Sequence, residues 1–259
     1  MKFGIVGLGV VGRHIRNDLA HAGTVSNQYF IYDPAINFNN CLAINECETV
    51  FVCVPTPQAQ DGSADLSAIH EVFSWLRVPC AIIRSTVPPG TTERLQKSPD
   101  MAVVFCPEFI GEGVNAPYVQ MRQPPFLILG GQPWATHRAA QAFARLYNSE
   151  CRIFTPDART AETIKYAENS YLATRVTFFN EWHDICTKLG ANWEQFVLGL
   201  GLDYRIGYVH SHVYDDERGF SGRCLPKDTA AILAQVGEET APLLAAVRRI
   251  NEEHRKRNA

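Results

Sequence analysis

No apolar run in the 259-residue sequence approaches the ~20 residues that a membrane-spanning helix needs. Charge of one sign is not in excess either, since 24 Lys and Arg residues face 27 Asp and Glu residues and the formal net charge is −3. This balance gives no reason to expect a nucleic-acid or membrane partner. The 18 glycines are too few for a collagen-like chain. With 46% hydrophobic and 20% charged residues, the composition predicts a soluble globular protein with a hydrophobic core.

The eight cysteines lack CxxC spacing and no histidine cluster accompanies them, so we expect no zinc or other metal site. Cys53 and Cys106 lie inside apolar runs, where cysteine acts as a small hydrophobic residue. The N-terminal residues 1–6 already read as the start of a strand, so we expect no signal peptide. From these observations we expect a cytoplasmic protein whose thiols are reduced.

Short apolar runs alternate with amphipathic segments over residues 1–156. The apolar runs are rich in Val, Ile and Phe, as is typical of parallel strands covered on both faces. They comprise residues 3–6, 29–32, 50–54, 80–84, 102–105, 126–129 and 151–154. The helical segments between them include residues 10–21, 66–76 and 134–147. This alternation predicts an α/β fold with a Rossmann-like, doubly wound parallel sheet in a first domain, residues 1–156.

The pattern changes after residue 156. Residues 158–189 contain neither Gly nor Pro, which predicts one long helix ended by Gly190. A second helix over 192–200, a Gly-rich irregular stretch over 201–224 and a terminal helical region over 227–257 follow. We therefore expect a second, all-helical domain, residues 157–259, built on the long helix.

Gly7, Gly9 and Gly12 form a GxGxxG pattern directly after the first predicted strand and at the start of a helix. The first glycine permits a tight turn, the second lets a pyrophosphate approach the backbone, and the third allows close helix–strand packing. A GxGxxG pattern alone is equally typical of a structural turn, but here Asp33 ends the next strand, where it can bind ribose hydroxyls and repel a 2′-phosphate. The context predicts dinucleotide binding, with NAD preferred over NADP.

Two further groups of polar residues can carry chemistry. Lys165 and Asn169 share one face of the long helix and can stabilise an oxyanion, although a solvated helix face is the commoner reason for such a pair. Cys224 lies in a polar, Gly-rich loop between Arg223 and Lys227, whose charges favour the thiolate. Nearby Asp228 can activate a water, and a buried structural cysteine is the alternative.

Polar segments also follow two predicted strands. Residues 85–92 carry hydroxyl groups, and residues 107–113 carry the carboxylates of Glu108 and Glu112. Both segments follow strands, so they lie at the carboxyl end of the sheet, where ligands bind in such folds. A capping or turn role is the alternative for each.

Together these segments resemble the UDP-glucose/GDP-mannose dehydrogenase family. The matching stretches are GLGVVG (7–12), VPTP (54–57), STVPPGTT (85–92), PEFIGEG (107–113), Lys165 and Asn169, Asn180 with Glu181, DYRIG (203–207) and GFSGRCLPKD (219–228). The resemblance runs from residue 4 to about residue 251, and in combination these motifs are highly specific.

The resemblance implies oxidation of a sugar C6 alcohol to a carboxylate with two NAD. Cys224 matches the nucleophile that holds the sugar as a thiohemiacetal and then a thioester. Lys165 and Asn169 match the residues that stabilise oxyanions. Asp228, with a water near Thr86, matches the base, and Glu108 matches the carboxylate linked to thioester hydrolysis.

The resemblance also implies binding roles and a homodimer. Expected cofactor contacts are Gly7, Gly9, Val10, Val11, Gly12, Asp33, Pro55, Thr56, Thr86 and Glu112. Expected substrate contacts are Glu108, Phe109, Lys165, Asn169, Arg205 and Gly219. Arg205 matches an arginine that reaches the substrate of the neighbouring subunit, because family members dimerise through the helical region. The expected partners are therefore a nucleotide sugar or other sugar and a second copy of the chain.

The sequence departs from the family pattern in two places. Ser221 and Arg223 stand in a loop where the family is richer in glycine, and the side chain of Ser221 narrows this loop. Family members continue into a third domain that holds the nucleotide, whereas this sequence stops at Ala259, so we expect poor turnover of UDP-glucose by this chain alone. The alternatives are a two-electron hydroxyacid-type dehydrogenase, in which Cys224 is idle, and a non-catalytic NAD-binding subunit.

Overall fold

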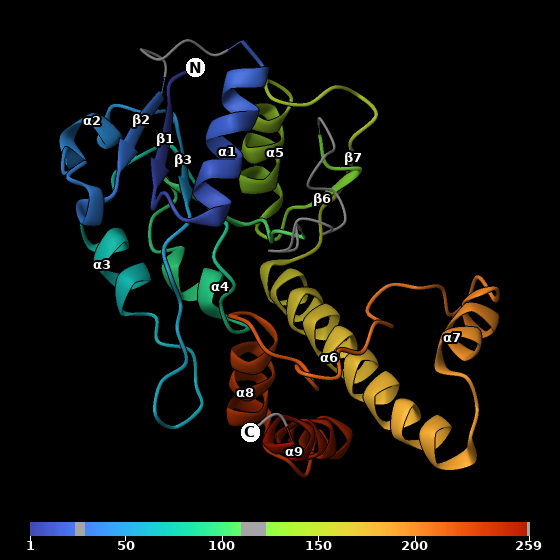
Figure 1. Cartoon of the computed structure of the whole chain (residues 1–259). Helices are drawn as coiled ribbons and strands as arrows, with labels where there is room; N and C mark the ends of the chain where they lie inside the picture. The colour runs from blue at the N-terminus through green and yellow to red at the C-terminus, as the bar shows by residue number, and fades with distance from the viewer. Residues whose placement is uncertain (24–28, 110–122, 258–259) are drawn as a thin grey trace. The chain divides into compact units, whose positions relative to one another are not determined.

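The computed structural model describes residues 1–23, 29–109 and 123–257 (Figure 1). The chain divides into two compact units. The first comprises Met1–Pro57 and Asp65–Lys165, and the second comprises Gln58–Ala64 and Tyr166–Ala259.

The first unit is built on a five-stranded parallel sheet with the strand order β2-β1-β3-β4-β5. Its strands are β1 (Phe3–Val6), β2 (Tyr29–Tyr32), β3 (Thr49–Val52), β4 (Cys80–Ile83) and β5 (Ala102–Phe105). Four of the five strands are completely buried, which explains why they read as continuous apolar runs.

Helices cover both faces of this sheet. Helices α1 (Val10–His21) and α5 (Pro133–Phe143) pack on one face, and Figure 1 shows them side by side. The short helices α2 (Cys41–Asn45) and α4 (Thr91–Leu95), with α3 (Ser67–Trp75), pack on the other. The predicted α/β class, with a Rossmann-like parallel sheet followed by a helical region, is confirmed.

The last two predicted strands do not join the main sheet. Strands β6 (Phe126–Ile128) and β7 (Arg152–Phe154) form a separate two-stranded parallel sheet, joined to β5 by the antiparallel bridge between Phe105 and Gly130. All three residues of β7 are exposed, so the expectation that this strand is covered on both faces is wrong. Its apolar residues satisfy the strand pattern, but no helix packs over them among the described residues.

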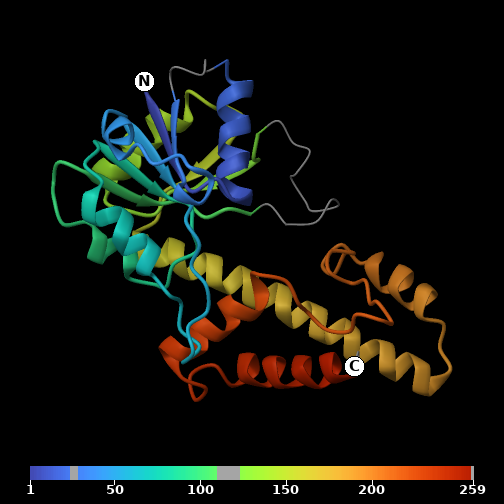
Figure 2. The same ribbon diagram turned by 60° about the vertical axis from the view of Figure 1, so that its left-hand side comes forward.

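The second unit is helical, and one long helix links it to the first. Helix α6 (Ala158–Leu189) has the predicted bounds and appears as one uninterrupted helix in Figure 2. It ends where Gly190 takes a left-handed conformation with φ +69°, as a C-terminal glycine does. Helix α7 (Trp193–Gly201) follows, and Asn192 caps it by accepting a hydrogen bond from Gln195 N.

The terminal helical region predicted over 227–257 consists of two helices. Helix α8 (Leu225–Val236) ends at Gly237, which has φ +79°, and α9 begins at Pro242 and runs to Lys256. Proline lacks an N–H and is tolerated in the first turn of a helix, so Pro242 starts a new helix.

The compact units divide within α6, between Lys165 and Tyr166, and not at residue 156. The first turns of α6 are tied to the first unit because buried Glu162 accepts hydrogen bonds from Gly90 N (2.5 Å) and from Thr92 N and Oγ1 (2.8 and 2.7 Å). A hydrogen-bonded carboxylate of this kind holds the start of α6 on the sheet domain. The division between the two units therefore lies inside α6 rather than at its start.

Within the described ranges, no helix combines the length and the apolar character that crossing a membrane requires. Nor does this part of the chain bring together three or more His, Cys, Asp or Glu side chains that could hold a metal ion.

Candidate active site

The Gly-rich loop between β1 and α1 has a geometry that only glycine allows at two of its positions. Gly7 has φ +90°, and a Cβ there would lie 2.7 Å from Cys53 O. A Cβ on Gly12 would lie 2.0 Å from Gly7 O, so α1 can pack this closely only without a side chain. At Gly9 a Cβ would meet nothing within 4 Å, so the surface beside the first turn of α1 is open.

The start of α1 suits an anion. No side chain caps it, and its first turn holds no acidic residue, so its terminal N–H groups and the positive end of the helix dipole face outward. Val10, in this turn, is 53% exposed, and Val11 is half-buried. An open glycine backbone beside an uncapped helix start fits the pyrophosphate of a dinucleotide.

Asp33 lies next to the same loop. One carboxylate oxygen accepts a hydrogen bond from Leu8 N at 2.7 Å and the other accepts one from Ala35 N at 3.2 Å. A carboxylate oxygen has more than one acceptor position, so Asp33 can hold the loop and still accept from ribose hydroxyls.

The loops after β3 and β4 are fastened to each other. The hydroxyl of Thr56 donates to Thr86 O at 2.8 Å, and that of Ser85 donates to Val54 O at 2.6 Å. Thr56 is buried, whereas Pro55 beside it is exposed. The strand order reverses between β1 and β3, and the crevice at such a point is where ligands bind in open α/β sheets.

Gly12 and Gly9 offer a matched pair of substitutions. We expect Gly12→Ala to lower the free energy of unfolding by about 1–3 kcal/mol or more, because its Cβ would overlap backbone that cannot yield. Gly9→Ala, with open space around its Cβ, should leave the unfolding free energy within about 0.5 kcal/mol of wild type and weaken NAD binding. Urea unfolding and calorimetric NAD titration measure both effects. Equal losses of stability in the two variants would contradict this account.

Glu108, after β5, forms a buried ion pair with Arg84 at the end of β4. Arg84 is 4% exposed and also donates to the sulfur of Cys106. Burial opposes ionisation of Glu108, but the Arg84 guanidinium, helped by Phe109 N–H, holds the pKa of that carboxyl below its usual range. Glu108 is therefore a carboxylate fixed in place rather than a group that changes protonation near neutral pH.

Two residues predicted to contact substrate touch each other. Lys165 Nζ lies 4.9 Å from the centre of the Phe109 ring, and Phe109 in turn packs against Phe126 with the ring centres 5.0 Å apart. Lys165 is 8% exposed, and a cation is held more strongly against an aromatic face when it is desolvated. Glu112, predicted to contact the cofactor, lies outside the described residues.

Cys224 lies at the start of α8 in the second unit. It is exposed and occupies the N-cap position, and its carbonyl accepts the first helical hydrogen bond, from Asp228 N at 3.0 Å. Gly222, with φ +79° and open space around it, leaves one side of the loop unobstructed. A helix N-terminus favours negative charge, which suits a thiolate.

Asp228 holds the other polar residues of this unit together. It is 1% exposed, accepts a hydrogen bond from Asn169 Nδ2 at 2.6 Å and pairs with Lys227. An asparagine amide has two N–H donors, so Asn169 keeps a second one for an oxyanion. The structure thus brings Asn169, Lys227 and Asp228 together, and Asp228 positions the two donors.

Arg205 and Ser221 have partners nearby in the sequence, and Gly219 packs against α9. Arg205 is 75% exposed in its side chain and pairs with Asp203 of its own chain at 2.6 Å. Ser221 donates to Glu217 Oε1 at 3.0 Å. Gly219, with φ +79°, packs so tightly that a Cβ would lie 2.6 Å from Asn251 Oδ1, which supplies a packing reason for this glycine.

Sequence reasoning missed Arg84 and Asn251. Arg84 directly follows the apolar run of β4, and an arginine at the end of a fully buried strand indicates a buried acidic partner. Asn251 occupies the same buried face of α9 as Leu244 and Val247, so a polar residue in an apolar helical stripe was the available signal.

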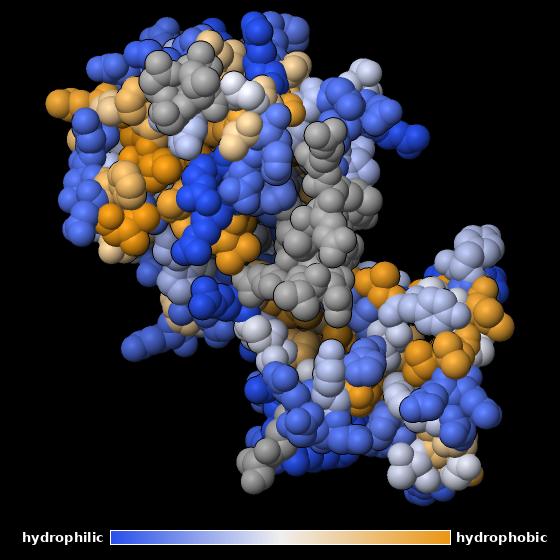
Figure 3. Space-filling view, turned by 45° about the horizontal axis from the view of Figure 1, so that its top comes forward, coloured by the Kyte–Doolittle hydropathy of each residue, from blue (hydrophilic) through white to orange (hydrophobic). Residues whose placement is uncertain are grey.

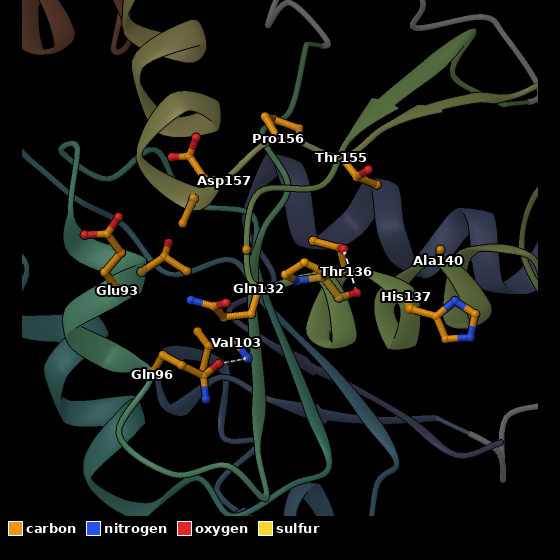
Figure 4. A pocket seen from close by; sticks show the side chains of 14 residues that line it. Glu93, Gln96, Val103, Gln132, Thr136, His137, Ala140, Thr155, Pro156 and Asp157 are labelled. Carbon is orange, nitrogen blue, oxygen red and sulfur yellow. Dashed lines mark hydrogen bonds between the residues drawn. The ribbon is translucent and has the colours of Figure 1, made fainter.

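A hollow of about 620 Å³ in the first unit holds none of the predicted site residues. Figure 4 shows Glu93, Gln96, Gln132 and Asp157 around it. Gln96 is engaged in holding the backbone, since its Oε1 accepts from Val103 N at 2.8 Å and its Nε2 donates to Met101 O at 2.8 Å. Since none of the predicted site residues lines the hollow, we assign it no part in the expected chemistry.

Comparison with known proteins agrees with this geometry. Residues 34–150 match the NAD binding domain, and residues 159–253 match the central domain, of the UDP-glucose/GDP-mannose dehydrogenase family. The UDP-glucose 6-dehydrogenase of Rhizobium meliloti is 33% identical over 226 residues, which are 80% of this chain and 51% of the relative. UDP-glucose 6-dehydrogenase YwqF of Bacillus subtilis is 33% identical over 85% of this chain and 52% of its own length.

A solved structure is also similar. The UDP-glucose dehydrogenase of the archaeon Pyrobaculum islandicum superimposes with a TM-score of 0.78 at 26% identity, covering 97% of this chain and 68% of that one. This chain spans about half the length of the curated relatives it matches. Because two domain models of one family match successive parts of the sequence, this chain belongs to the UDP-glucose/GDP-mannose dehydrogenase family.

Proposed function

We propose that this protein oxidises the C6 alcohol of a nucleotide sugar, of which UDP-glucose is the first candidate, to the carboxylate with NAD. The observation that carries the proposal is the exposed thiol of Cys224 at the N-terminus of α8, in a chain that has the family's NAD binding and central domains. The relatives named UDP-glucose 6-dehydrogenase support the choice of substrate.

The first unit supplies the residues that would hold NAD. The open backbone at Gly9 and the uncapped start of α1 would bind the pyrophosphate, and Asp33 would accept from the ribose hydroxyls. NAD, when bound, accepts one hydride in each of two successive oxidations.

The proposed chemistry needs a nucleophile between the two oxidations. In the first oxidation the C6 alcohol would lose a hydride to NAD and its hydroxyl proton to a water held by Asp228, which gives an aldehyde. The Cys224 thiolate would then form a bond to the aldehyde carbon, and the carbonyl oxygen would take up a proton to give a thiohemiacetal. The second oxidation gives a thioester, and water breaks its C–S bond to release the carboxylate and the thiol. Asn169 and the ammonium of Lys165 would stabilise the oxyanions, and Glu108 would support hydrolysis.

The ratio of NADH to product tests this proposal. With UDP-glucose and excess NAD, we expect two NADH for each molecule of UDP-glucuronic acid, measured by absorbance and mass spectrometry. One NADH for each product molecule would instead identify a two-electron dehydrogenase in which Cys224 is idle. Tight NAD binding without turnover on UDP-glucose, other nucleotide sugars or free sugars would identify a non-catalytic subunit.

The proposal includes a homodimer in the cytoplasm, where thiols stay reduced. Large apolar side chains are exposed on the helical unit, among them Leu198, Leu202 and Tyr204 at 62%, 82% and 92%, and Figure 3 shows hydrophobic patches on the surface. Exposed apolar surface of this kind favours association between chains. A monomer in light scattering at micromolar concentration would contradict the homodimer.

A further inference from the structure

The loop before Cys224 is bound by an asparagine of the last helix. Asn251 of α9 is 6% exposed, and its Oδ1 accepts from Phe220 N at 2.6 Å while its Nδ2 donates to Phe220 O at 3.1 Å. Both backbone groups of Phe220 are thus satisfied by one side chain. Because both the oxygen and the nitrogen of this buried side-chain amide are hydrogen-bonded, moving the loop would leave a buried polar group without a hydrogen bond.

An arginine of the same helix binds the chain just after Cys224. Arg248 Nη1 donates to Pro226 O at 2.7 Å and to Thr229 Oγ1 at 2.9 Å. Arg248 and Asn251 are three residues apart, so they share one face of α9. This face therefore holds the backbone four residues before Cys224 and two residues after it.

Helix α6 anchors the loop from another direction. Asn180, 2% exposed, accepts hydrogen bonds at its Oδ1 from Gly219 N (2.9 Å) and from Arg218 Nε (2.8 Å). The ring of Phe220, 4% exposed, is packed with Ala173 of α6 and Val247 of α9. The loop thus has a small core of its own, and Asn251 adds the hydrogen bonds that fix its register.

We propose that Asn251 and Arg248 of α9 are positioning residues that hold Cys224 at the N-terminus of α8. This inference deepens the proposed function, because it concerns the residue that acts there as the nucleophile. Without the two side chains, the loop loses its bonds to α9 on both sides of the cysteine. The thiolate then loses part of its alignment with the helix dipole, which acts only within the first turn.

Alkylation of Cys224 measures this position without any need for turnover. The variants are Asn251→Ala and Arg248→Met, with Asn251→Asp as the conservative replacement and Glu252→Ala, at an exposed position of α9, as the control. The rate of iodoacetamide labelling of the Cys224 peptide is followed by mass spectrometry as a function of pH. Thermal unfolding and NAD titration confirm that each variant is folded.

We expect Asn251→Ala and Arg248→Met to label about two- to fivefold more slowly at pH 7, with the midpoint of the pH profile moved upward. Asn251→Asp keeps an acceptor for Phe220 N, so its labelling rate should lie between those of Asn251→Ala and the wild type. Glu252→Ala should label at the wild-type rate. In turnover, kcat should fall while the KM for NAD stays unchanged.

Wild-type labelling rates and pH midpoints in folded Asn251→Ala and Arg248→Met would overturn the inference. If Asn251→Ala does not fold, Arg248→Met and Asn251→Asp decide it by the same profile. If Asn251→Ala shifts the labelling profile but Cys224→Ser stays fully active, the positioning role stands and the proposed function is wrong. The two failures are therefore distinguishable.

Discussion

Replacement of Cys224 by serine is expected to lower the rate of acid formation by at least about 10³-fold while leaving NAD binding unchanged. The serine hydroxyl is not ionised near neutral pH, so it is a weak nucleophile. A serine alkoxide is also a poorer leaving group than a cysteine thiolate when water hydrolyses the acyl intermediate. Because Cys224 lies in the second unit and the glycine-rich loop lies in the first, the substitution should not disturb the cofactor residues. Acid formation is measured by mass spectrometry and NAD affinity by calorimetry.

Cys41→Ser is a suitable control, because Cys41 is a half-buried cysteine of the first unit with no proposed role. It should turn over at the wild-type rate. Acid formation by Cys224→Ser at the wild-type rate, with two NADH for each product, would show that the thiol is not the nucleophile. A variant that releases one NADH and stops would agree with trapping at the aldehyde stage.

Removal of the guanidinium of Arg84 is expected to have the largest effect on stability. Arg84→Met should lower the free energy of unfolding by about 3–5 kcal/mol, because it removes the guanidinium that pairs with the Glu108 carboxylate away from solvent. The double variant Arg84→Met/Glu108→Gln should recover part of the loss, since it also removes the negative charge of Glu108. Urea unfolding at pH 7 measures both.

The pH dependence of this loss has a definite sign. In the wild type, Arg84 holds the pKa of Glu108 below its usual range. The ion pair therefore stabilises the fold fully at pH values above the usual pKa of a glutamate. This stabilisation is lost only as the pH falls through the lowered pKa. In Arg84→Met, burial still raises the pKa of Glu108, and only the weaker effects of His14 and the Phe109 N–H oppose it. The pKa is therefore higher than in the wild type, and protonation relieves the variant as the pH falls from 7 to 5. The stability difference should therefore shrink toward pH 5. A difference that is equal at both pH values, with no recovery in the double variant, would contradict the buried pair.

The secondary structure that depends on short-range signals was predictable. Helix α1 and helix α6 have the predicted bounds, because a glycine precedes the first and a glycine in a left-handed conformation ends the second. The break between α8 and α9 has a similar signal in Gly237 and Pro242. The exposed strand β7 was misread because Ile and Phe satisfy a strand pattern whether or not a helix covers them.

The sequence by itself determined which chemical groups this protein has. It identified the glycine pattern, Cys224, Lys165 and Asn169, because residue type and spacing carry the motif and the motif carries the family resemblance. Periodicity also indicated which faces are buried, since burial repeats with the turn of a helix or the pleat of a strand.

Only the tertiary structure decided which partner each buried polar group has. Asn169 and Asp228 are 59 residues apart, Phe220 and Asn251 are 31 apart, and Arg84 and Glu108 are 24 apart. A buried amide or charged group requires a hydrogen-bond donor or acceptor nearby. The local sequence indicates that such a partner is required but not which residue supplies it. Packing of α6, α8 and α9 supplies the partners in the helical unit, and the adjacent ends of β4 and β5 supply them in the sheet unit.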